Sequence, residues 1–393
     1  MSFKKTLIAA AMTLGLVGAA QAADDLKVGM ILPMSGPHSE YGLQILNGAK
    51  LYMQHHGDTV AGRKVVLVVK DDTGVAPEIS KRAAQELIVK DKVDVLAGFG
   101  LTPSAFSVAP VATEAKTPMI VMNAATSSVT ERSPYIVRAS MTLPQNSAPI
   151  AQWASENGIK RVYTLVADYG PGHDAEKQFI KTFTELGGEI VGEVRTPVQN
   201  PDFSPYLSRI KDAKPDAVFM FVPSGAQGVA FLKGYAERGL DEDGIKLIAT
   251  GDLTDEYVLD SMGDEALGLI TSFHYSDAHD SELNKKYTED YAKNWPDVRP
   301  NFMSIGGYDG MHVIYEAVKA NDGDASGDKF IEAAKGLSWE SPRGPVSIDP
   351  ETRDIIQDIY IREVQRVDGR LINAEFDKVE QVKDPGKEAK KES

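Results

Sequence analysis

Two segments rich in hydroxyl groups and backbone N–H groups follow expected strands of the chain. Gly98-Phe99-Gly100-Leu101-Thr102-Pro103-Ser104 comes after the expected strand 93–97, and Asn123-Ala124-Ala125-Thr126-Ser127-Ser128 after the strand 118–122. Ligands of open parallel sheets bind beyond the carboxyl ends of the strands, and helix N-termini there attract anions. Leu101, Thr102, Ala124, Ala125 and Thr126 are therefore the candidate cradle for an anion. Thr102 and Thr126 could equally serve as helix caps.

A second pair of strand ends further along the chain offers an aromatic ring and an acid. Tyr169 stands in Val166-Ala167-Asp168-Tyr169-Gly170, and Asp252 in Thr250-Gly251-Asp252. An anion cradle that faces a ring and a carboxylate suits a small zwitterion or a hydroxy-acid. Asp252 could instead cap the helix that follows it.

Motifs of enzymes are missing from the sequence. Gly98-Phe99-Gly100 resembles the start of a dinucleotide fingerprint, but Pro103 occupies the position of its third glycine. There is no phosphate-binding loop of the Gly-x-x-x-x-Gly-Lys-Ser/Thr type and no Gly-x-Ser-x-Gly turn. The histidines, among them His55, His56, His274 and His279, lack the spacing of metal ligands. We therefore expect no enzyme, no cofactor and no metal site.

The elements that must position these residues alternate between apolar strands and amphipathic helices, which is typical of βα units around parallel sheets. We expect two doubly wound lobes. The first has strands at 26–32, 64–70, 93–97 and 118–122 and helices at 42–55, 77–89 and 104–115. The second has strands at 161–167, 189–198, 217–222, 245–249 and 268–274 and helices at 146–157, 175–186, 204–211 and 227–238. Helices at 281–294 and 304–320 and a hairpin of strands 354–365 and 370–376 follow.

The first residues have the pattern of a secretory signal peptide. Lys4 and Lys5 precede an apolar run, and Ala20-Gln21-Ala22 is a small-x-small cleavage site, so we expect cleavage after Ala22 and export to the periplasm. The chain has no cysteine and a net charge of −15, which argues against disulfides and against nucleic acid as a partner. Residues 379–393 are mostly charged and are expected to form a disordered tail.

The chain resembles the periplasmic leucine/isoleucine/valine-binding protein family over nearly all of its length after the signal peptide. The residues that carry the resemblance run from Val28-Gly29 through Met34-Ser35-Gly36-Pro37 and Tyr41-Gly42, then Asn123-Ala124-Ala125-Thr126, Asp168-Tyr169-Gly170 and Thr250-Gly251-Asp252. It implies an α/β fold of periplasmic-binding-protein type I, with two doubly wound lobes joined by three hinge crossings near Ser140, His274 and Ile348. Lobe one would comprise 23–141 and 275–350, and lobe two 142–274 and 351–378.

The resemblance also implies a role: capture of a branched-chain amino acid or related small carboxylate for the permease subunits of an ABC importer, by a monomer whose lobes close on the ligand. Leu101, Thr102, Ala124, Ala125 and Thr126 would hold the ligand's carboxylate and part of its amine. Tyr169 would pack over the ligand, Asp252 would accept the ammonium, and Tyr41 and Phe302 would line the side-chain pocket.

One departure leaves the ligand open. Amino-acid binders of this family often have an aromatic residue where this chain has Val222-Pro223-Ser224-Gly225, so we expect an enlarged pocket with Ser224 in its wall. The segments 122–140 and 168–172 resemble the branch that binds aromatic carboxylates such as hydroxybenzoates and cinnamates, in which Asp252 would accept a phenolic hydroxyl. A periplasmic sensor for a membrane chemoreceptor would use the same site. A repressor would need a helix-turn-helix, and a receptor a membrane span, and the sequence has neither.

Overall fold

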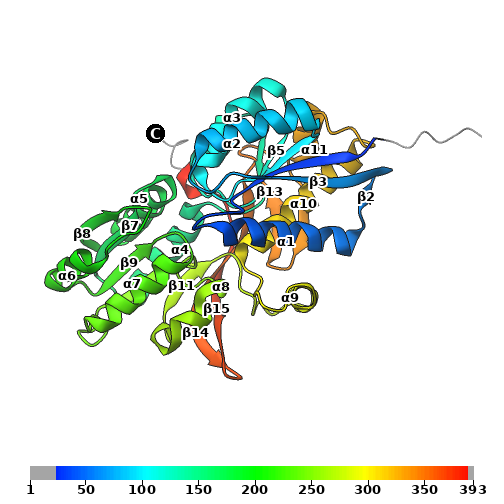
Figure 1. Cartoon of the computed structure of the whole chain (residues 1–393). Coiled ribbons are helices and arrows are strands. Elements are labelled where there is room, and N and C mark those ends of the chain that lie inside the picture. Colours follow the sequence, from blue (N-terminus) through cyan, green and yellow to red (C-terminus); the bar gives the residue numbers. More distant parts are fainter. Residues whose placement is uncertain (1–23, 388–393) are drawn as a thin grey trace, which may run out of the picture.

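The computed structural model describes residues 24–387 and has two α/β lobes that lie side by side (Figure 1). The predicted fold class, two lobes built on largely parallel sheets, is confirmed. The predicted signal peptide, residues 1–22, lies outside the described residues.

The first lobe is built on a six-stranded sheet in which only the β2–β3 pair is antiparallel. Its strands, in spatial order, are β2 (Thr59–Val60), β3 (Arg63–Asp71), β1 (Leu26–Leu32), β4 (Val95–Gly98), β5 (Met119–Val121) and β6 (Ile136–Arg138). Side chains of β1 alternate between the two faces. Val28 and Met30 pack in the same cluster as α1 (Ser39–His56) and α10 (Phe302–Ala320), whereas Ile31 packs with α2 (Pro77–Glu86) and α3 (Thr102–Ala115).

Helices α1 and α10 touch through two glycines. A Cβ on Gly48 would stand 1.8 Å from the carbonyl oxygen of Ser304, and one on Gly307 would stand 2.1 Å from that of Ile45. Only glycine permits this approach of two backbones. The contact brings the first turn of α1, with Tyr41, near the first turn of α10, with Phe302.

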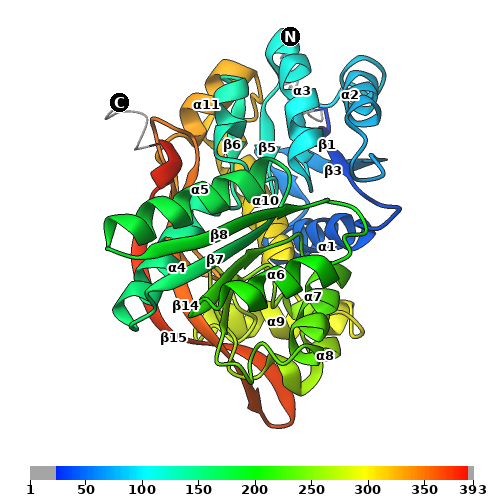
Figure 2. The same cartoon turned by 90° about the vertical axis from the view of Figure 1, so that its left-hand side faces the viewer.

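The second lobe has a parallel core in the order β8 (Glu189–Thr196), β7 (Arg161–Ala167), β9 (Ala217–Phe221), β10 (Lys246–Thr250) and β11 (Ile270–Phe273). Helices α4 (Leu143–Glu156) and α5 (Gly170–Glu185) cover one face (Figure 2). Helices α6 (Ser204–Ala213), α7 (Ala226–Glu237) and α8 (Glu256–Met262) cover the other, packed in a separate apolar cluster.

The long strands β14 (Ile355–Val367) and β15 (Arg370–Val382) connect the lobes. The start of β14 pairs with β13 (Gly344–Ile348), and Arg353, just before β14, accepts a backbone hydrogen bond from Arg138 of β6 at 2.9 Å. Further on, Tyr360–Glu363 pair with β11 of the second lobe. The third crossing between lobes therefore lies within β14, a few residues beyond the expected Ile348, and β12 (Ser338–Ser341) and β13 belong to the nine-stranded sheet through β14.

The expected tail at 379–393 differs from the structure. β15 continues to Val382 and runs back along β14, and Asp384 and Lys387 are buried against lobe one. Within this segment, residues 388–393 lie outside the described part. The tail was misjudged because its charged residues pair: Lys383 lies 3.2 Å from Asp349, and Lys387 contacts Asp354.

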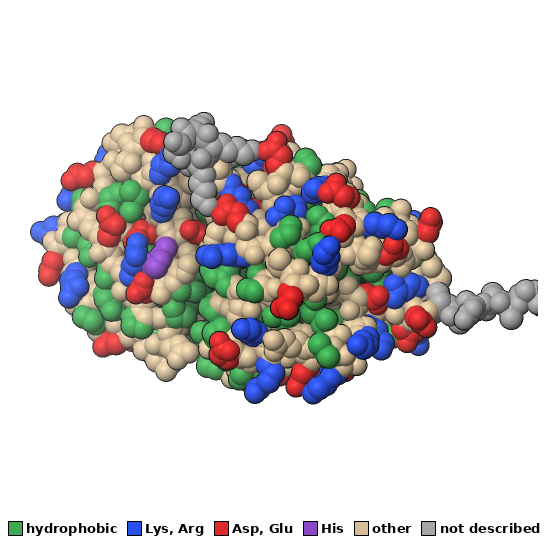
Figure 3. All heavy atoms as spheres, turned by 90° about the horizontal axis from the view of Figure 1, so that it is seen from above, with side chains coloured by type: hydrophobic (Ala, Val, Ile, Leu, Met, Phe, Trp, Pro, Cys, Tyr) green, Lys and Arg blue, Asp and Glu red, His purple; other side chains and the backbone are tan. Residues whose placement is uncertain are grey.

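Several elements were not predicted. Besides β2, β6, α8 and the hairpin β12–β13, these are η2 (Ser127–Arg132), η3 (Gly263–Ala266) and α11 (Gly327–Ala334). The expected helix 77–89 is α2 followed by η1 (Leu87–Asp91), and α9 (Glu282–Asn294) was expected. No helix among residues 24–387 is long and apolar enough to span a membrane. On the face seen from above, acidic and basic side chains are interspersed and do not form a single basic patch (Figure 3).

Candidate functional site

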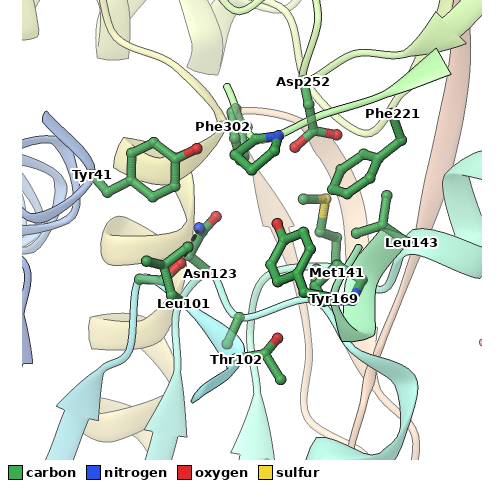
Figure 4. A pocket seen from close by; sticks show the side chains of 15 residues that line it. Tyr41, Leu101, Thr102, Asn123, Met141, Leu143, Tyr169, Phe221, Asp252 and Phe302 are labelled. Atoms are coloured by element: carbon green, nitrogen blue, oxygen red, sulfur yellow. Dashed lines mark hydrogen bonds between the residues drawn. The ribbon is translucent and has the colours of Figure 1, made fainter. Parts of the chain in front are cut away.

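A cavity of about 320 Å³ lies between the lobes, at the carboxyl ends of the strands (Figure 4). Both lobes and the hinge contribute to its wall. The residues that line it are Tyr41, Gly100, Leu101, Thr102, Asn123, Ala124, Ala125, Met141, Leu143, Tyr169, Pro171, Phe221, Pro223, Asp252 and Phe302. This volume includes space that is open to solvent.

The lobe-one end of the cavity is formed by two loops that follow β4 and β5. Leu101 is the extended residue before α3, and Thr102 is the first residue of that helix, whose first-turn N–H groups lack partners within the helix. The side-chain amide of Asn123 donates to the carbonyl of Gly100 at 2.7 Å, which ties the two loops together. The Oδ1 atom of Asn123 is buried and has no partner among the described residues. This end therefore offers donors from a helix N-terminus and one free acceptor.

The lobe-two wall combines two aromatic rings with one acid. Tyr169, which precedes α5, stacks on Phe221 at the end of β9 with ring centroids 6.1 Å apart. Asp252 follows β10 and is 5% exposed, and its Oδ2 accepts a hydrogen bond of 2.8 Å from the hydroxyl of Thr250. Burial raises the pKa of Asp252 to about 7 because desolvation penalises its charged form.

Thr102 and Asp252 lie at opposite ends of the cavity (Figure 4). Tyr41, Tyr169, Phe221 and Phe302 are the aromatic side chains along the length between them. The arrangement fits a flat molecule with an anionic group at one end and a hydrogen-bond donor at the other.

Direct contacts join the lobes around the cavity. The hydroxyl of Tyr41 donates to the carbonyl of Ser224 at 3.0 Å, and the backbone N–H of Ser127 donates to Oδ2 of Asp174 on α5 at 2.8 Å. These contacts, from lobe one to lobe two in each case, describe a closed arrangement of the lobes.

Eight of the ten residues chosen from the sequence line the cavity: Tyr41, Leu101, Thr102, Ala124, Ala125, Tyr169, Asp252 and Phe302. The other two stand behind it. The hydroxyl of Thr126 lies 3.0 Å from that of Thr102, so it supports a lining residue. The side chain of Ser224 donates to Asp255, and Pro223 occupies the place in the wall that was expected for Ser224.

The sequence interpretation missed six side chains of the wall: Asn123, Met141, Leu143, Pro171, Phe221 and Pro223. The segment 222–225 has no aromatic residue, as the sequence shows, but Phe221, one position before Val222, places an aromatic ring of lobe two in the wall. Met141 and Leu143 lie on the first hinge crossing. Within residues 24–387 no group of three or more His, Asp or Glu side chains could hold a metal ion.

Two lobes that close on a small cavity define a solute-binding protein. Comparison with known proteins assigns the family: the chain belongs to the periplasmic binding protein family, whose model matches residues 25–370. It is the solute-binding protein of an ABC transporter.

The similar proteins cover almost the whole chain. The Leu/Ile/Val-binding protein homolog 6 of Brucella melitensis is 46% identical over 98% of this chain and 100% of its own length. The solute-binding protein of an ABC transporter from Rhodopseudomonas palustris BisB5, solved with 3,4-dihydroxybenzoic acid, is 57% identical, with a TM-score of 0.89 over 93% of this chain and 99% of its own. A second, from Rhodopseudomonas palustris HaA2 with p-hydroxybenzoic acid, is 45% identical, with a TM-score of 0.90 over the same shares.

Proposed function

We propose that this protein captures a hydroxybenzoate in the periplasm and delivers it to the permease subunits of its ABC transporter. The observation that carries the proposal is the placement of the anion cradle around Thr102 and of Asp252 at opposite ends of one aromatic cavity. In 4-hydroxybenzoate the carboxylate and the hydroxyl stand at opposite ends of a flat ring. The relatives solved with 3,4-dihydroxybenzoic and p-hydroxybenzoic acid support the same choice.

The ligand's carboxylate would take hydrogen bonds from the hydroxyl of Thr102 and from backbone N–H groups around Leu101, Thr102 and Ala125, where the N-terminus of α3 favours negative charge. The ring would lie among Tyr41, Tyr169 and Phe302, and the phenolic hydroxyl would donate to Asp252. Binding and release of the ligand in this way make and break no covalent bond, so the protein would act as a carrier and not as an enzyme. The leader would direct export of the chain and would be cleaved after Ala22.

A branched-chain amino acid fits this cavity less well. Its ammonium and carboxylate are attached to the same carbon, so with the carboxylate in the cradle the ammonium would face Asn123 and not Asp252. A neutral amide oxygen does not compensate a buried ammonium, and burial of an unpaired charge is costly. A sensor role before a membrane chemoreceptor would use the same site, and assays of uptake and of taxis in a deletion strain separate the two.

Titration calorimetry on protein refolded to remove bound ligand tests the proposal. We expect 4-hydroxybenzoate and 3,4-dihydroxybenzoate to bind, benzoate to bind more weakly, and leucine and valine not to bind. At pH 8, above the pKa of about 7 of Asp252, Asp252→Asn should weaken 4-hydroxybenzoate about 10- to 150-fold, the value of a hydrogen bond to a charged acceptor. Benzoate, which lacks the hydroxyl, is the matched control and should not lose affinity. Binding of leucine with no response to hydroxybenzoates would refute the proposal.

A further inference from the structure

Two helices from opposite lobes meet at their N-terminal caps. Helix α8 of lobe two begins after Asp255, whose side chain accepts a hydrogen bond from the backbone N–H of Tyr257. Helix α10 of lobe one begins after Asn301, whose Oδ1 accepts from the backbone N–H groups of Met303 and Ser304. The Nδ2 atom of Asn301 donates across the cleft to both oxygens of Asp255, at 2.9 and 3.2 Å. We call Asp255 and Asn301 the cap pair.

Each member of the cap pair is fixed to its own lobe. Asn301 belongs to lobe one because α10 packs backbone to backbone on α1, where Gly48 approaches the carbonyl of Ser304. Asp255 belongs to lobe two because α8, through Val258, packs in the same apolar cluster as α6 and α7. Separation of the lobes must therefore break the hydrogen bonds of the cap pair, while each residue still caps its own helix.

The carboxylate of Asp255 is buried in the closed arrangement and depends on its hydrogen bonds. Asp255 and Asn301 are 2% and 1% exposed. Burial raises the pKa of Asp255, and hydrogen bonds from Ser224, Tyr257 and Asn301 oppose this shift. Ser224 and Tyr257 stay with lobe two when the lobes part, and water then replaces Asn301. Loss of the donor on Asn301 would therefore leave a buried acceptor unsatisfied in the closed state alone, which is costly.

The cap pair is next to the wall of the ligand cavity on both lobes. Phe302, which lines the cavity, directly follows Asn301. On lobe two the hydroxyl of Ser224 donates to Asp255, and Ser224 directly follows Pro223 of the wall. The same carboxylate therefore holds one segment of the wall from each lobe.

We propose that Asp255 is a positioning residue that keeps the lobes closed, and that its contact with Asn301 sets how long a ligand stays in the cavity. Asp255 is not among the residues that line the cavity, whereas Asp252, three residues earlier, is. The contact acts between the lobes and not on the ligand. It therefore goes beyond the proposed function and holds for any small carboxylate that the lobes enclose.

An exchange of the two caps tests the proposal, because Asp and Asn are equally good N-caps. Asn301→Asp sets two carboxylates face to face, and at pH 8 it should speed dissociation of 4-hydroxybenzoate at least about tenfold in stopped-flow fluorescence. Asp255→Asn keeps an oxygen that accepts from Asn301 and should stay within about fivefold of the wild type. The double variant again sets a donor opposite a carboxylate, in reversed order, and should return to within about fivefold. All three should melt, without ligand, within a few degrees of the wild type.

The distance between the lobes is a second readout and needs no ligand. The chain has no cysteine, so Glu78→Cys on α2 and Lys233→Cys on α7, both at exposed positions, can carry a pair of fluorescent dyes. Energy transfer in single molecules should show a smaller closed fraction for Asn301→Asp than for the wild type, with and without 4-hydroxybenzoate. The double variant should recover the closed fraction of the wild type.

Asp260→Asn is the matched control. Asp260 lies on the same helix as the cap pair's acid and 3.2 Å from Arg299 of lobe one, but its side chain is 59% exposed, so this ion pair contributes little. The control should change neither readout by more than about twofold. If neither readout distinguished Asn301→Asp from the double variant, the role of the cap pair would be overturned. Failure of 4-hydroxybenzoate to bind the wild type would overturn the proposed function only, since the dyes would still report on the cap pair.

Discussion

Lys387 and Asp354 form an ion pair in the interior of the protein, 6% and 2% exposed in their side chains. The Oδ1 atom of Asp354 lies 3.1 Å from Nε of Arg138, and Arg138 donates to the carbonyl of Thr126 at 2.7 Å. Asp384 accepts a further hydrogen bond from the hydroxyl of Ser127. The last described turn of the chain thus holds the loop that follows β5, which forms part of the wall of the ligand cavity.

Removal of the charge at position 387 should destabilise the protein. Lys387→Met leaves one oxygen of Asp354 without a cation in a buried site, and loss of one partner of a buried pair costs about 3–5 kcal/mol. We expect the free energy of unfolding to fall by about 3 kcal/mol, because Arg138 still compensates the charge of Asp354. We also expect a weaker affinity for the ligand, because the loop at Thr126 is then held less firmly. Urea denaturation and calorimetry measure the two effects.

Lys383→Met is the matched control for this prediction. Lys383 lies 3.2 Å from Asp349, but its side chain is 52% exposed, and exposed pairs contribute at most about 1 kcal/mol. Equal stabilities of the two variants would show that residues 384–387 do not hold the loop.

Strand order and helix starts made most of the cavity predictable from the sequence. Leu101, Ala125 and Asp252 follow strands whose apolar runs are plain in the sequence, and the carboxyl ends of parallel strands meet at one edge. Phe221 was missed because side chains alternate along a strand, and the sequence did not show whether Phe221 or Val222 faces the ligand.

Other parts of the cavity and of the fold depend on contacts between residues far apart in the sequence, and the spacing of apolar residues along the chain does not reveal such contacts. Met141 belongs to the hinge, where no repeat pattern marks the residues that turn inward. The segment 379–387 has the composition of a disordered tail, and it is ordered because Lys387 finds Asp354, 33 residues away, and Ser127 finds Asp384.

The raised pKa of Asp252 should make stability depend on pH. Its pKa of about 7 in the folded protein lies above the ordinary value of 3.8, so folding favours the protonated form. The contribution to stability is complete below pH 3.8 and is lost as the pH rises through 7. Asp252→Asn should therefore gain free energy of unfolding relative to the wild type between pH 5 and pH 8, by about 3 kcal/mol.

Urea denaturation of ligand-free protein at both pH values measures this gain. Asp202→Asn is the control, because hydrogen bonds from Ser204 lower the pKa of Asp202 below 3.8 and it stays ionised throughout the window. A difference between Asp252→Asn and wild type that did not change with pH would contradict the raised pKa.

The bond between Tyr41 and Ser224 should set how long the closed state lasts. Tyr41→Phe keeps the ring in the cavity wall and removes only the hydroxyl that joins the lobes. A bond of this kind contributes about 0.5–1.5 kcal/mol, so we expect 4-hydroxybenzoate to bind about 2- to 10-fold more weakly through faster dissociation. Stopped-flow fluorescence separates the two rates. Tyr206→Phe on α6, outside the cavity wall, should change neither rate.

Thr102 and Thr126 should differ in their effect on binding although their hydroxyls touch. Thr102 lines the cavity, whereas Thr126 reaches it only through its contact of 3.0 Å with Thr102. Thr102→Val removes a hydroxyl at the carboxylate end and should weaken 4-hydroxybenzoate about tenfold, as expected for a hydrogen bond to a charged group. Thr126→Val should weaken it two- to threefold, because it only frees the Thr102 hydroxyl to rotate. Both variants keep the volume of the side chain, and both should retain the melting temperature of the wild type within a few degrees. A larger loss for Thr126→Val than for Thr102→Val would mean that Thr126 itself touches the ligand, and that the loop after β5 moves when the ligand binds.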